Sequence, residues 1–312
     1  MSLSAALAIA LCVVTTADAG QQVTLRWQFE PGESLVYRMN MSQESELPNG
    51  MGVAVVEMTT TMRWEVLEVS DEGDATVRVT TERVQMRMDG PMGNMTADSA
   101  SETPPNDPVG QMVTGLAGVS YTLVFDSSGQ LKEVTNLDEL REQLAAAGGS
   151  NPAVGQALEQ FASEDGIKDT MARGMLAFPD GPVGPGDTWD YDYDMQMPML
   201  GTMSIEMVMT LNGTEDRDGS RIALIDSTGT MAFLPDDNPQ NPAAGMMDLA
   251  DAALTGTMEW DVDRGRLIRN SGDTTMQMDI NAGGQQMSMV MVMHMTMELV
   301  EDASAASDRR GF

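Results

Sequence analysis

Hydrophobic and polar positions alternate along most of the chain, and most strictly near its C-terminus. Methionine occupies every second position of one stretch there, namely Met287, Met289, Met291, Met293, Met295 and Met297. In an extended strand, successive side chains point to opposite faces, so this period places all the thioethers on one face. A helix would distribute them around its axis. The pattern therefore predicts a long β-strand with one wholly apolar, flexible face.

Similar alternation predicts further strands in the first half of the chain, near residues 22–29, 36–41, 51–69 and 75–88. Acidic residues and glycine between Asp71 and Asp74 are typical of a hairpin turn. Residues 90–110 are rich in proline and polar side chains, which predicts a mobile loop. A hairpin is then expected around Asp126–Gly129.

The middle of the chain, residues 136–178, is the one stretch with helical spacing. Asn136 is a candidate cap for a first helix, and Asn151-Pro152 is a candidate start for a second. The apolar positions expected on the inner sides of these two helices are Leu137, Leu140, Leu144, Val154, Leu158 and Phe161. A third helix is suggested by Ile167, Met171 and Met175.

The second half of the chain repeats features of the first. A Pro-Gly-acid-hydroxyl turn leads into a strand with tyrosine and Met-x-Met both after Pro31 and after Pro185. We therefore predict two similar β-rich units, residues 20–135 and 179–301, followed by a disordered tail over 302–312. The predicted fold is mainly β, with long, antiparallel, strongly curved sheet and a few central helices. Whether the halves form one sheet or two stays open.

The N-terminus predicts export. An apolar run from Leu3 to Val14 precedes Ala17-Asp18-Ala19, a signal-peptidase pattern, so residues 1–19 are expected to be a cleaved signal peptide. No Lys or Arg precedes the run, which leaves an uncleaved anchor or an upstream start as alternatives. Cys12 is the single cysteine, so the mature chain is expected to lack disulfides and thiol chemistry. The expected location is periplasmic or extracellular.

Charge limits the range of partners. The formal net charge is −31, from 48 acidic and 17 basic residues, so nucleic acid and anionic membrane surfaces should be repelled. A partner protein is not identifiable from the sequence. Solubility, or adaptation to a salty medium, accounts for such acidity more simply than an acidic binding function does.

Several segments carry a resemblance. They are the leading stretch from Leu25 to Tyr37, the strand-turn from Asp126 to Leu131, and the entry from Phe178 to Trp189. Together they resemble an exported bacterial family of unknown function, common in planctomycete-type genomes, which implies a fold but no catalytic residue. A curled sheet with helices on its concave side is also similar to periplasmic lipoprotein carriers of the LolA/LppX kind, which hold acyl chains between sheet and helices.

The methionine faces allow three interpretations. Methionine can simply fill a packed core, in a structural or protein-interaction module of the envelope. It can line a deformable cavity for a lipid or other hydrophobic ligand, in a non-enzymatic carrier, which is the function we expect. It can bind Cu(I) or Ag(I) through Met-x-Met strands. The candidate cavity residues are Met195, Met197, Met207, Met209, Met287, Met289, Met291, Met293, Met295, Met297, Leu140, Leu144, Leu158 and Phe161.

Other chemistry has weaker signals, and we expect no enzymatic activity and no cofactor. His294 is the single histidine, lies on the face opposite the methionines, and cannot by itself build a histidine-based zinc site. Acidic turns at Asp71–Asp74, Glu215–Asp218 and Asp261–Asp263 could hold Ca²⁺, but none has the full twelve-residue loop. Asp and Gly are also what hairpin turns need.

Overall fold

Antiparallel strands make up most of the computed structural model, which describes residues 22–91, 93–102, 107–127, 130–138, 140–142, 178–197, 201–235, 247–282 and 285–302. The strands are β1 Ser34–Leu47, β2 Gly52–Val69, β3 Ala75–Asp89, β4 Met95–Asp98, β5 Ser120–Phe125, β6 Leu131–Thr135, β7 Thr188–Met197, β8 Gly201–Arg217, β9 Ser220–Pro235, β10 Met247–Asp261, β11 Arg266–Ala282 and β12 Gln285–Asp302. The helical elements are η1, Pro48–Gly50, and α1, Pro108–Gly115.

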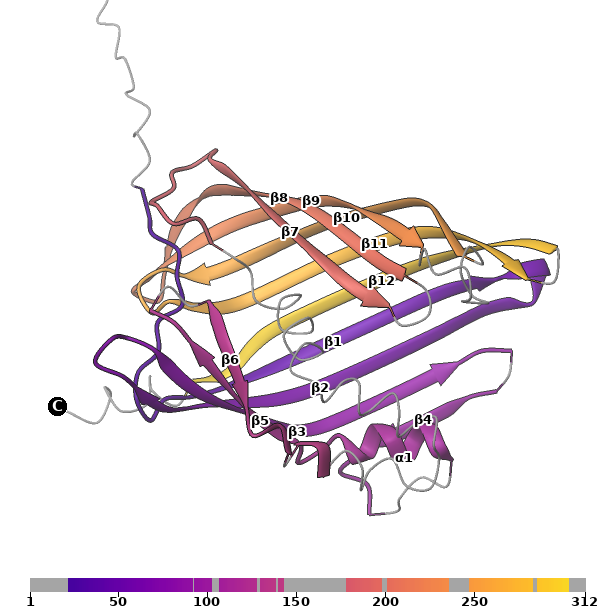
Figure 1. Ribbon diagram of the computed structural model, residues 1–312, viewed down its shortest axis with the longest axis horizontal. Helices are drawn as coiled ribbons and strands as arrows, with labels where there is room; N and C mark the ends of the chain where they lie inside the picture. Colours follow the sequence, from indigo (N-terminus) through magenta and orange to yellow (C-terminus); the bar gives the residue numbers. More distant parts are fainter. Residues whose placement is uncertain are drawn as a thin grey trace, which may run out of the picture.

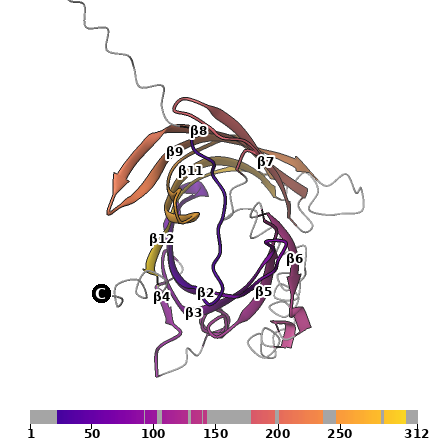
Figure 2. The ribbon, with the colours of Figure 1, turned by 90° about the vertical axis from the view of Figure 1, so that its left-hand side faces the viewer.

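All the strands belong to one 12-stranded sheet. Its order is β6-β5-β3-β2-β1-β12-β11-β10-β9-β8-β7, and β4 pairs with β3 beside this path. The sheet curls so that it wraps around an interior (Figures 1 and 2). The first and last strands pair in its middle, from Leu35 opposite Asp302 to Glu46 opposite Val290. The predicted fold class is confirmed, and the open question is answered: both halves share one sheet.

Read from the edge at β7, the sheet contains the strands of the second half in chain order, β7 to β12, and then those of the first half in chain order, from β1 to β6. β4 pairs with residues 85–88 of β3 and β5 with residues 75–80, so these two short strands together occupy the place that β10 occupies beside β9. Among the described strands, β12 then has no counterpart in the first half. Tandem duplication would produce this order, and the duplication itself stays a prediction.

The first predicted strand, over residues 22–29, is not part of the sheet. This N-terminal segment crosses one end of the curled sheet (Figure 2) and forms an isolated β-bridge between Val23 and Val183. Val23, Leu25 and Trp27 are nevertheless buried. Alternation arises from any extended backbone with one buried side, so the pattern predicted the buried face correctly and the sheet pairing wrongly.

The loop predicted over residues 90–110 is also partly wrong. β4 lies within it and pairs with β3, with Met88 opposite Met95. α1 begins there at Pro108, after Asp107 caps it by accepting a hydrogen bond from the Gly110 amide at 2.6 Å. This stretch contains prolines and many polar residues, yet both elements form in it. Pro108 is compatible with α1 because the first turn of a helix tolerates proline.

Only the beginning of the predicted helical segment, residues 136–178, lies within the described residues. The Leu140 amide donates to the Asn136 carbonyl at 3.2 Å, which starts a helical turn. Asn136 has a φ of 62°, and its side-chain amide donates to Thr122 Oγ1 at 3.0 Å; its role as a helix cap stays a prediction. Leu144, Leu158 and Phe161 lie outside the described residues.

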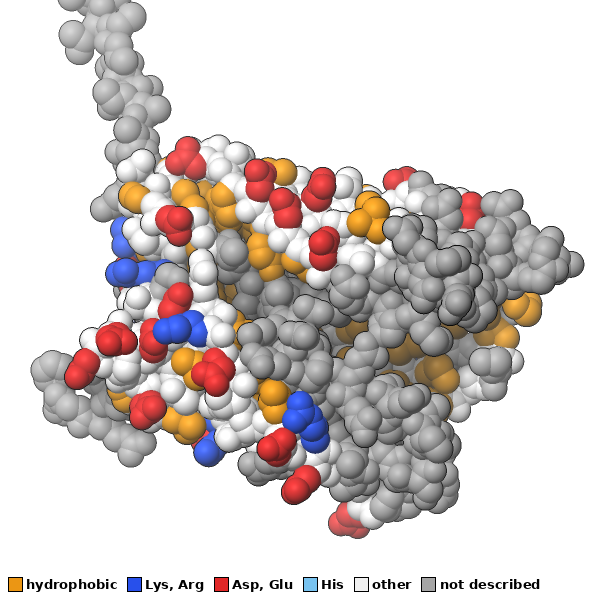
Figure 3. All heavy atoms as spheres, viewed as in Figure 1, with side chains coloured by type: hydrophobic (Ala, Val, Ile, Leu, Met, Phe, Trp, Pro, Cys, Tyr) orange, Lys and Arg blue, Asp and Glu red, His pale blue; other side chains and the backbone are white. Residues whose placement is uncertain are grey.

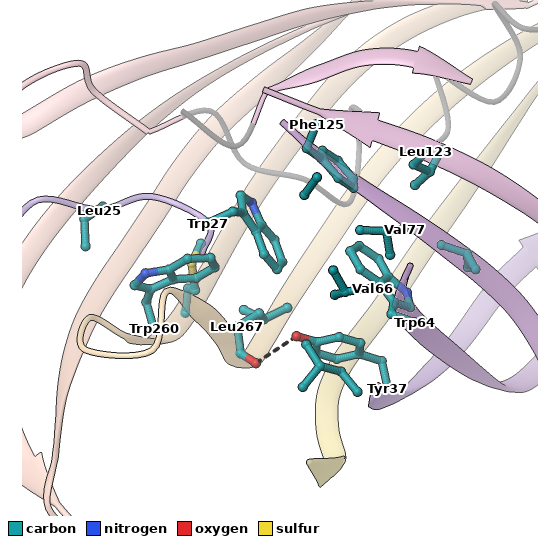
Figure 4. Packing of buried hydrophobic residues seen from close by; sticks show 14 of the residues in the cluster. Leu25, Trp27, Tyr37, Trp64, Val66, Val77, Leu123, Phe125, Trp260 and Leu267 are labelled. Carbon is teal, nitrogen blue, oxygen red and sulfur yellow. Dashed lines mark hydrogen bonds between the residues drawn. The ribbon is translucent and has the colours of Figure 1, made fainter. Parts of the chain in front are cut away.

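One end of the curled sheet is filled by aromatic side chains, and we call it the aromatic end; it contains Trp27, Trp64, Phe125 and Trp260 (Figure 4). The Trp27 ring lies 4.7 Å from Trp260 and 5.7 Å from Trp64, measured between centroids, and Trp64 lies 6.3 Å from Phe125. These rings come from both halves and from the N-terminal segment. Aromatic packing therefore joins the two halves at this end.

Polar contacts bind the same end together. Arg266, at the start of β11, pairs with Glu33 at 2.6 Å, and both side chains are almost fully buried. The Tyr37 hydroxyl donates to the Leu267 carbonyl at 3.4 Å (Figure 4). The backbone amide of Gln28 donates to the Gly265 carbonyl at 2.9 Å. The β10–β11 turn is thus attached to the N-terminal segment, to the turn before β1 and to β1 itself.

Candidate ligand-binding face

Residues that lie directly opposite each other in an antiparallel pair share one face of the sheet. Several such pairs consist of two methionines. Among them are Met39 with Met297, Met41 with Met295, Met41 with Met58, Met58 with Met86, Met276 with Met291 and Met278 with Met289. The second to fourth pairs join into a row of methionines across β12, β1, β2 and β3. The strand that the sequence singled out is therefore part of a surface that extends over its neighbours.

We call this surface the methionine face. By register, it includes every strand methionine whose side chain the structure describes, namely Met39, Met41, Met58, Met62, Met86, Met88, Met95, Met203, Met207, Met209, Met231, Met258, Met276, Met278, Met287, Met289, Met291, Met293, Met295 and Met297. The same face carries Trp64 and Ile225 of the buried core. It is therefore the inner face of the curled sheet.

Charged side chains are missing from most of this face. The region without charge begins at Tyr37 of β1 and Leu299 of β12 and extends to the ends of these strands that lie away from the aromatic end. Within it, the described inner positions of β12, β1, β2 and β3 carry no Asp, Glu, Lys or Arg. The polar inner positions there are uncharged, such as Gln43, Ser45 and Thr60. In a chain with 48 acidic residues, this leaves an apolar inner surface and a charged outer one.

Burial varies along the face. Met209 and Met258, which pack in the aromatic end, are each 2 % exposed. Met276 and Met278, towards the opposite ends of the strands, are each 7 % exposed, and most of the other methionines are only half-buried. We call this opposite part of the sheet the methionine end. It includes Met41 of β1, Met58 of β2, Met278 of β11 and Met289 of β12. Its side chains are less completely covered than those of the aromatic end.

The predicted cavity residues fall into three groups. Met207, Met209 and the six methionines of β12 lie on the methionine face, and Met195 and Met197 lie opposite Met203 and Gly201 in the backbone register. Leu140 is fully buried against the core of the aromatic end. Leu144, Leu158 and Phe161 lie outside the described residues. Their role as ligand contacts stays a prediction.

The predicted cavity residues did not include the methionines of β1, β2, β3 and β11, although the Met-x-Met spacing in β1, β3 and β11 was visible in the sequence. What brings Met39 and Met41 beside Met297 and Met295 is the pairing of the first strand with the last. Such pairing between the two ends of a chain has no signal in a single sequence.

The outer face is polar and acidic. Acidic side chains are scattered over the outside of the molecule, whereas hydrophobic side chains show in the hollow between its two halves (Figure 3). His294 lies on the outer face of β12, as its position in the alternation predicts. Its Nδ1 lies 2.7 Å from Asp273 Oδ1, and its side chain is half exposed.

The acidic turns have partners within the protein. Asp74 pairs with Lys132 at 2.5 Å, and Asp261 accepts hydrogen bonds from the amides of Asp263 and Arg264 at 3.0 and 2.9 Å. Asp263 pairs with Arg221 at 3.1 Å. Among the residues that the structure describes, no three His, Cys, Asp or Glu side chains come together as a metal site. These carboxylates close turns, which is the simpler interpretation of their pattern.

A polar groove of about 480 Å³ lies beside β2, β3 and β4, lined by Glu57, Thr59, Gln85, Met86, Arg87, Thr96, Ala97, Asp98 and Ser101. The Arg83 side chain donates two hydrogen bonds to Asp98, at 3.1 and 2.6 Å, and the Ala100 amide donates a third. These contacts hold the pKa of Asp98 well below its usual range. The groove was not predicted, because β4 was expected to be loop.

No helix in the described part of the chain is both long and apolar enough to cross a membrane.

Comparison with solved structures finds distant likenesses. A structure that concerns lipid–protein interactions in lipovitellin is 10% identical, with a TM-score of 0.47, and the match covers 88% of this chain but only 26% of the lipovitellin chain. DynF, from the dynemicin biosynthesis pathway of Micromonospora chersina, is 10% identical over 90% of this chain and 86% of its own, with a TM-score of 0.20. OpdQ of Pseudomonas aeruginosa is 6% identical over 88% of this chain and 100% of its own, with a TM-score of 0.21. Likenesses at these TM-scores say nothing about function.

A comparison with curated proteins gave no match. A family model does match, over residues 72–265, from the turn between β2 and β3 to the turn between β10 and β11. This confirms the resemblance to a family without an assigned activity. The chain belongs to the family of unknown function DUF6263.

Proposed function

We propose that the protein is a non-enzymatic, exported binding or carrier protein that holds a lipid or another hydrophobic molecule against the methionine face. One observation carries this proposal: every strand methionine whose side chain the structure describes points to the inner face of the curled sheet, and most of these methionines are only half-buried. A core that served stability alone gains most when its apolar side chains are fully buried. Half-buried apolar side chains on a concave surface still have area to offer to a ligand.

The shape and chemistry of the face favour an elongated apolar ligand. From Met287 to Met297 the face extends along β12 by roughly 33 Å, at about 3.3 Å per residue. Methionine has an unbranched, polarizable side chain that adapts to ligands of different shape. A charged group held against this part of the face would lose its hydration without gaining an ionic partner.

The same lack of ionisable groups is why we propose binding and not catalysis. General acid–base and nucleophilic chemistry needs titratable or nucleophilic side chains within reach of a substrate. Along β12, β1, β2 and β3, the described inner positions of the methionine end carry no Asp, Glu, His, Lys or Arg, so the hydroxyl of Ser45 has no general base among them to activate it. Export is proposed from the N-terminal sequence alone.

Native mass spectrometry of the mature protein, purified without detergent, is the direct test. We expect a discrete additional mass that is lost on denaturation, because an apolar ligand held inside the sheet should survive purification. A bare protein mass, both as purified and after incubation with phospholipid, would contradict the carrier function. It would leave the methionines as packing in a structural module.

A matched pair of variants locates the site. Met293→Gln with Met295→Gln adds polar groups to the methionine face, whereas Val292→Gln with Val300→Gln adds them to exposed outer positions of the same strand. With N-phenyl-1-naphthylamine, a neutral apolar fluorescent probe, we expect the inner pair to weaken binding by at least about tenfold and the outer pair to leave it unchanged. Equal effects of the two pairs would place the probe elsewhere.

A further inference from the structure

Two sets of four methionines on the methionine face form squares, each built from two neighbouring strands. In the first square, β12 and β11 contribute Met289 opposite Met278 and Met291 opposite Met276. In the second square, β12 and β1 contribute Met295 opposite Met41 and Met297 opposite Met39. Met293 separates the two squares and lies opposite Thr274 and Gln43. β12 is therefore shared by both squares.

The dimensions of such a square allow its sulfur atoms to converge. Directly opposite residues have Cβ atoms about 5 Å apart, and residues two apart on a strand are separated by roughly 7 Å. Each thioether sulfur is two bonds beyond Cβ, on a side chain whose bonds rotate freely. Four sulfurs can therefore approach a common point above the centre of the square, without any movement of the backbone.

The described side chains already cluster in the first square. Met276 and Met278 are 7 % exposed and form a buried cluster with Ala252, and Met289 and Met291 pack against that cluster. In the second square all four side chains are half-buried, and Met297 packs against the core of the aromatic end. Both squares thus combine proximity with access from the interior of the sheet.

Thioethers are neutral, soft ligands, which select soft ions such as Cu(I) over Ca²⁺ or Mg²⁺. A monovalent ion is also the least costly cation to bring onto an apolar surface, since the cost of desolvation rises with charge. The formal charge of −31 raises the local concentration of cations around the molecule. Among the described residues, no carboxylate or imidazole lies on the methionine face at the squares, so a hard ion would find no ligand among them.

We propose that each square is a binding site for one soft monovalent cation, with Cu(I) as the ion and the thioether sulfurs as its ligands. The proposal goes beyond the binding of an apolar molecule and does not rest on it. The ion uses sulfur lone pairs at two defined places, whereas an apolar ligand uses the area of the whole face.

The test is a titration of the mature protein with Ag(I), a redox-stable probe of the same chemistry, repeated with Cu(I) supplied anaerobically as its acetonitrile complex. Metal bound after desalting is counted by elemental mass spectrometry. We expect one ion per square in the wild-type protein and a sulfur-only shell in X-ray absorption. Met276→Leu with Met278→Leu should abolish one site, and Met39→Leu with Met41→Leu should abolish the other.

Leucine keeps nearly the volume of methionine, so these variants should remain folded, which circular dichroism checks. The control is Met203→Leu with Met207→Leu, which removes two half-buried methionines of the same face outside the squares. It should bind as many ions as the wild-type protein. The proposal fails if the wild-type protein retains no Ag(I), or if the variant lacking Met39, Met41, Met276 and Met278 retains as much as the control. Loss of metal binding without loss of N-phenyl-1-naphthylamine binding would leave the proposed function intact.

Discussion

At the scale of single residues, Gly265 decides how closely the N-terminal segment approaches the β10–β11 turn. Its φ is 61°, in the left-handed region that favours glycine. A Cβ added there would lie 2.5 Å from Gln28 Cγ and 2.7 Å from the backbone amide nitrogen of Gln28. The hydrogen bond from that amide to the Gly265 carbonyl depends on this close approach.

We therefore expect Gly265→Ala to lower the free energy of unfolding by roughly 2–4 kcal/mol, since it adds a steric clash to an unfavourable φ. Gly219→Ala is the control, because Gly219 has a φ of 81° but no atom within 4 Å of an added Cβ. That change should cost about 1 kcal/mol. Chemical denaturation measures both variants, and equal losses would show that the contact with Gln28 contributes nothing.

At the scale of elements, the buried pair of Glu33 and Arg266 connects the turn before β1 to the start of β11. The two residues are distant in sequence and belong to different halves of the chain. Removal of one member of a buried ion pair leaves a charge without its partner in a site that excludes water. The pair therefore fixes the relative positions of these two elements more than it adds net stability.

Glu33→Gln is expected to lower the free energy of unfolding by about 3–5 kcal/mol, as is Arg266→Met. Glu33→Leu together with Arg266→Met should recover a large part of that loss, because no uncompensated charge remains. For comparison, Arg38 and Glu298 form an exposed pair at 3.7 Å, and Arg38→Met should cost less than about 1 kcal/mol. A double-mutant cycle, measured by urea denaturation, gives the coupling free energy between the Glu33 and Arg266 substitutions. If the loss in the double variant equalled the sum of the two single losses, the pair would not connect the two elements as described.

At the scale of the whole molecule, the two ends of the sheet differ in packing. The large buried cluster, with its aromatic rings, fills one end, whereas the described residues of the methionine end form two small clusters, around Val84 and around Met276. Local stability follows the density of buried contacts. The aromatic end should therefore act as the stable base of the molecule and the methionine end as its adaptable part.

Hydrogen exchange followed by mass spectrometry tests this difference. We expect strand amides near Trp64 and Val77 to exchange at least about tenfold more slowly than strand amides near Met41 and Met86, because their neighbourhoods contain more buried apolar contacts. Addition of N-phenyl-1-naphthylamine should slow exchange at the methionine end and leave the aromatic end unchanged. Uniform protection along β1, β2 and β3 would contradict a stable base with an adaptable end.

The sequence by itself determined the strands and their inner faces. Alternation with a period of two is a local property of extended backbone, so it indicated the methionine strand, the buried side of residues 22–29 and the exposed side of His294. It also determined the mainly β class and the resemblance to a family of unknown function. It failed locally at β4 and α1, where proline and polar residues are compatible with either a loop or a short element.

Only the tertiary structure decided which strands are neighbours. The pairing of β1 with β12 closes the order of one sheet and places Met39 and Met41 beside Met297 and Met295. It leaves the N-terminal segment out of the sheet, across its end, where Gln28 meets Gly265. These contacts join residues that are distant in the chain, and their free energy depends on packing between faces, which no local pattern of one sequence encodes.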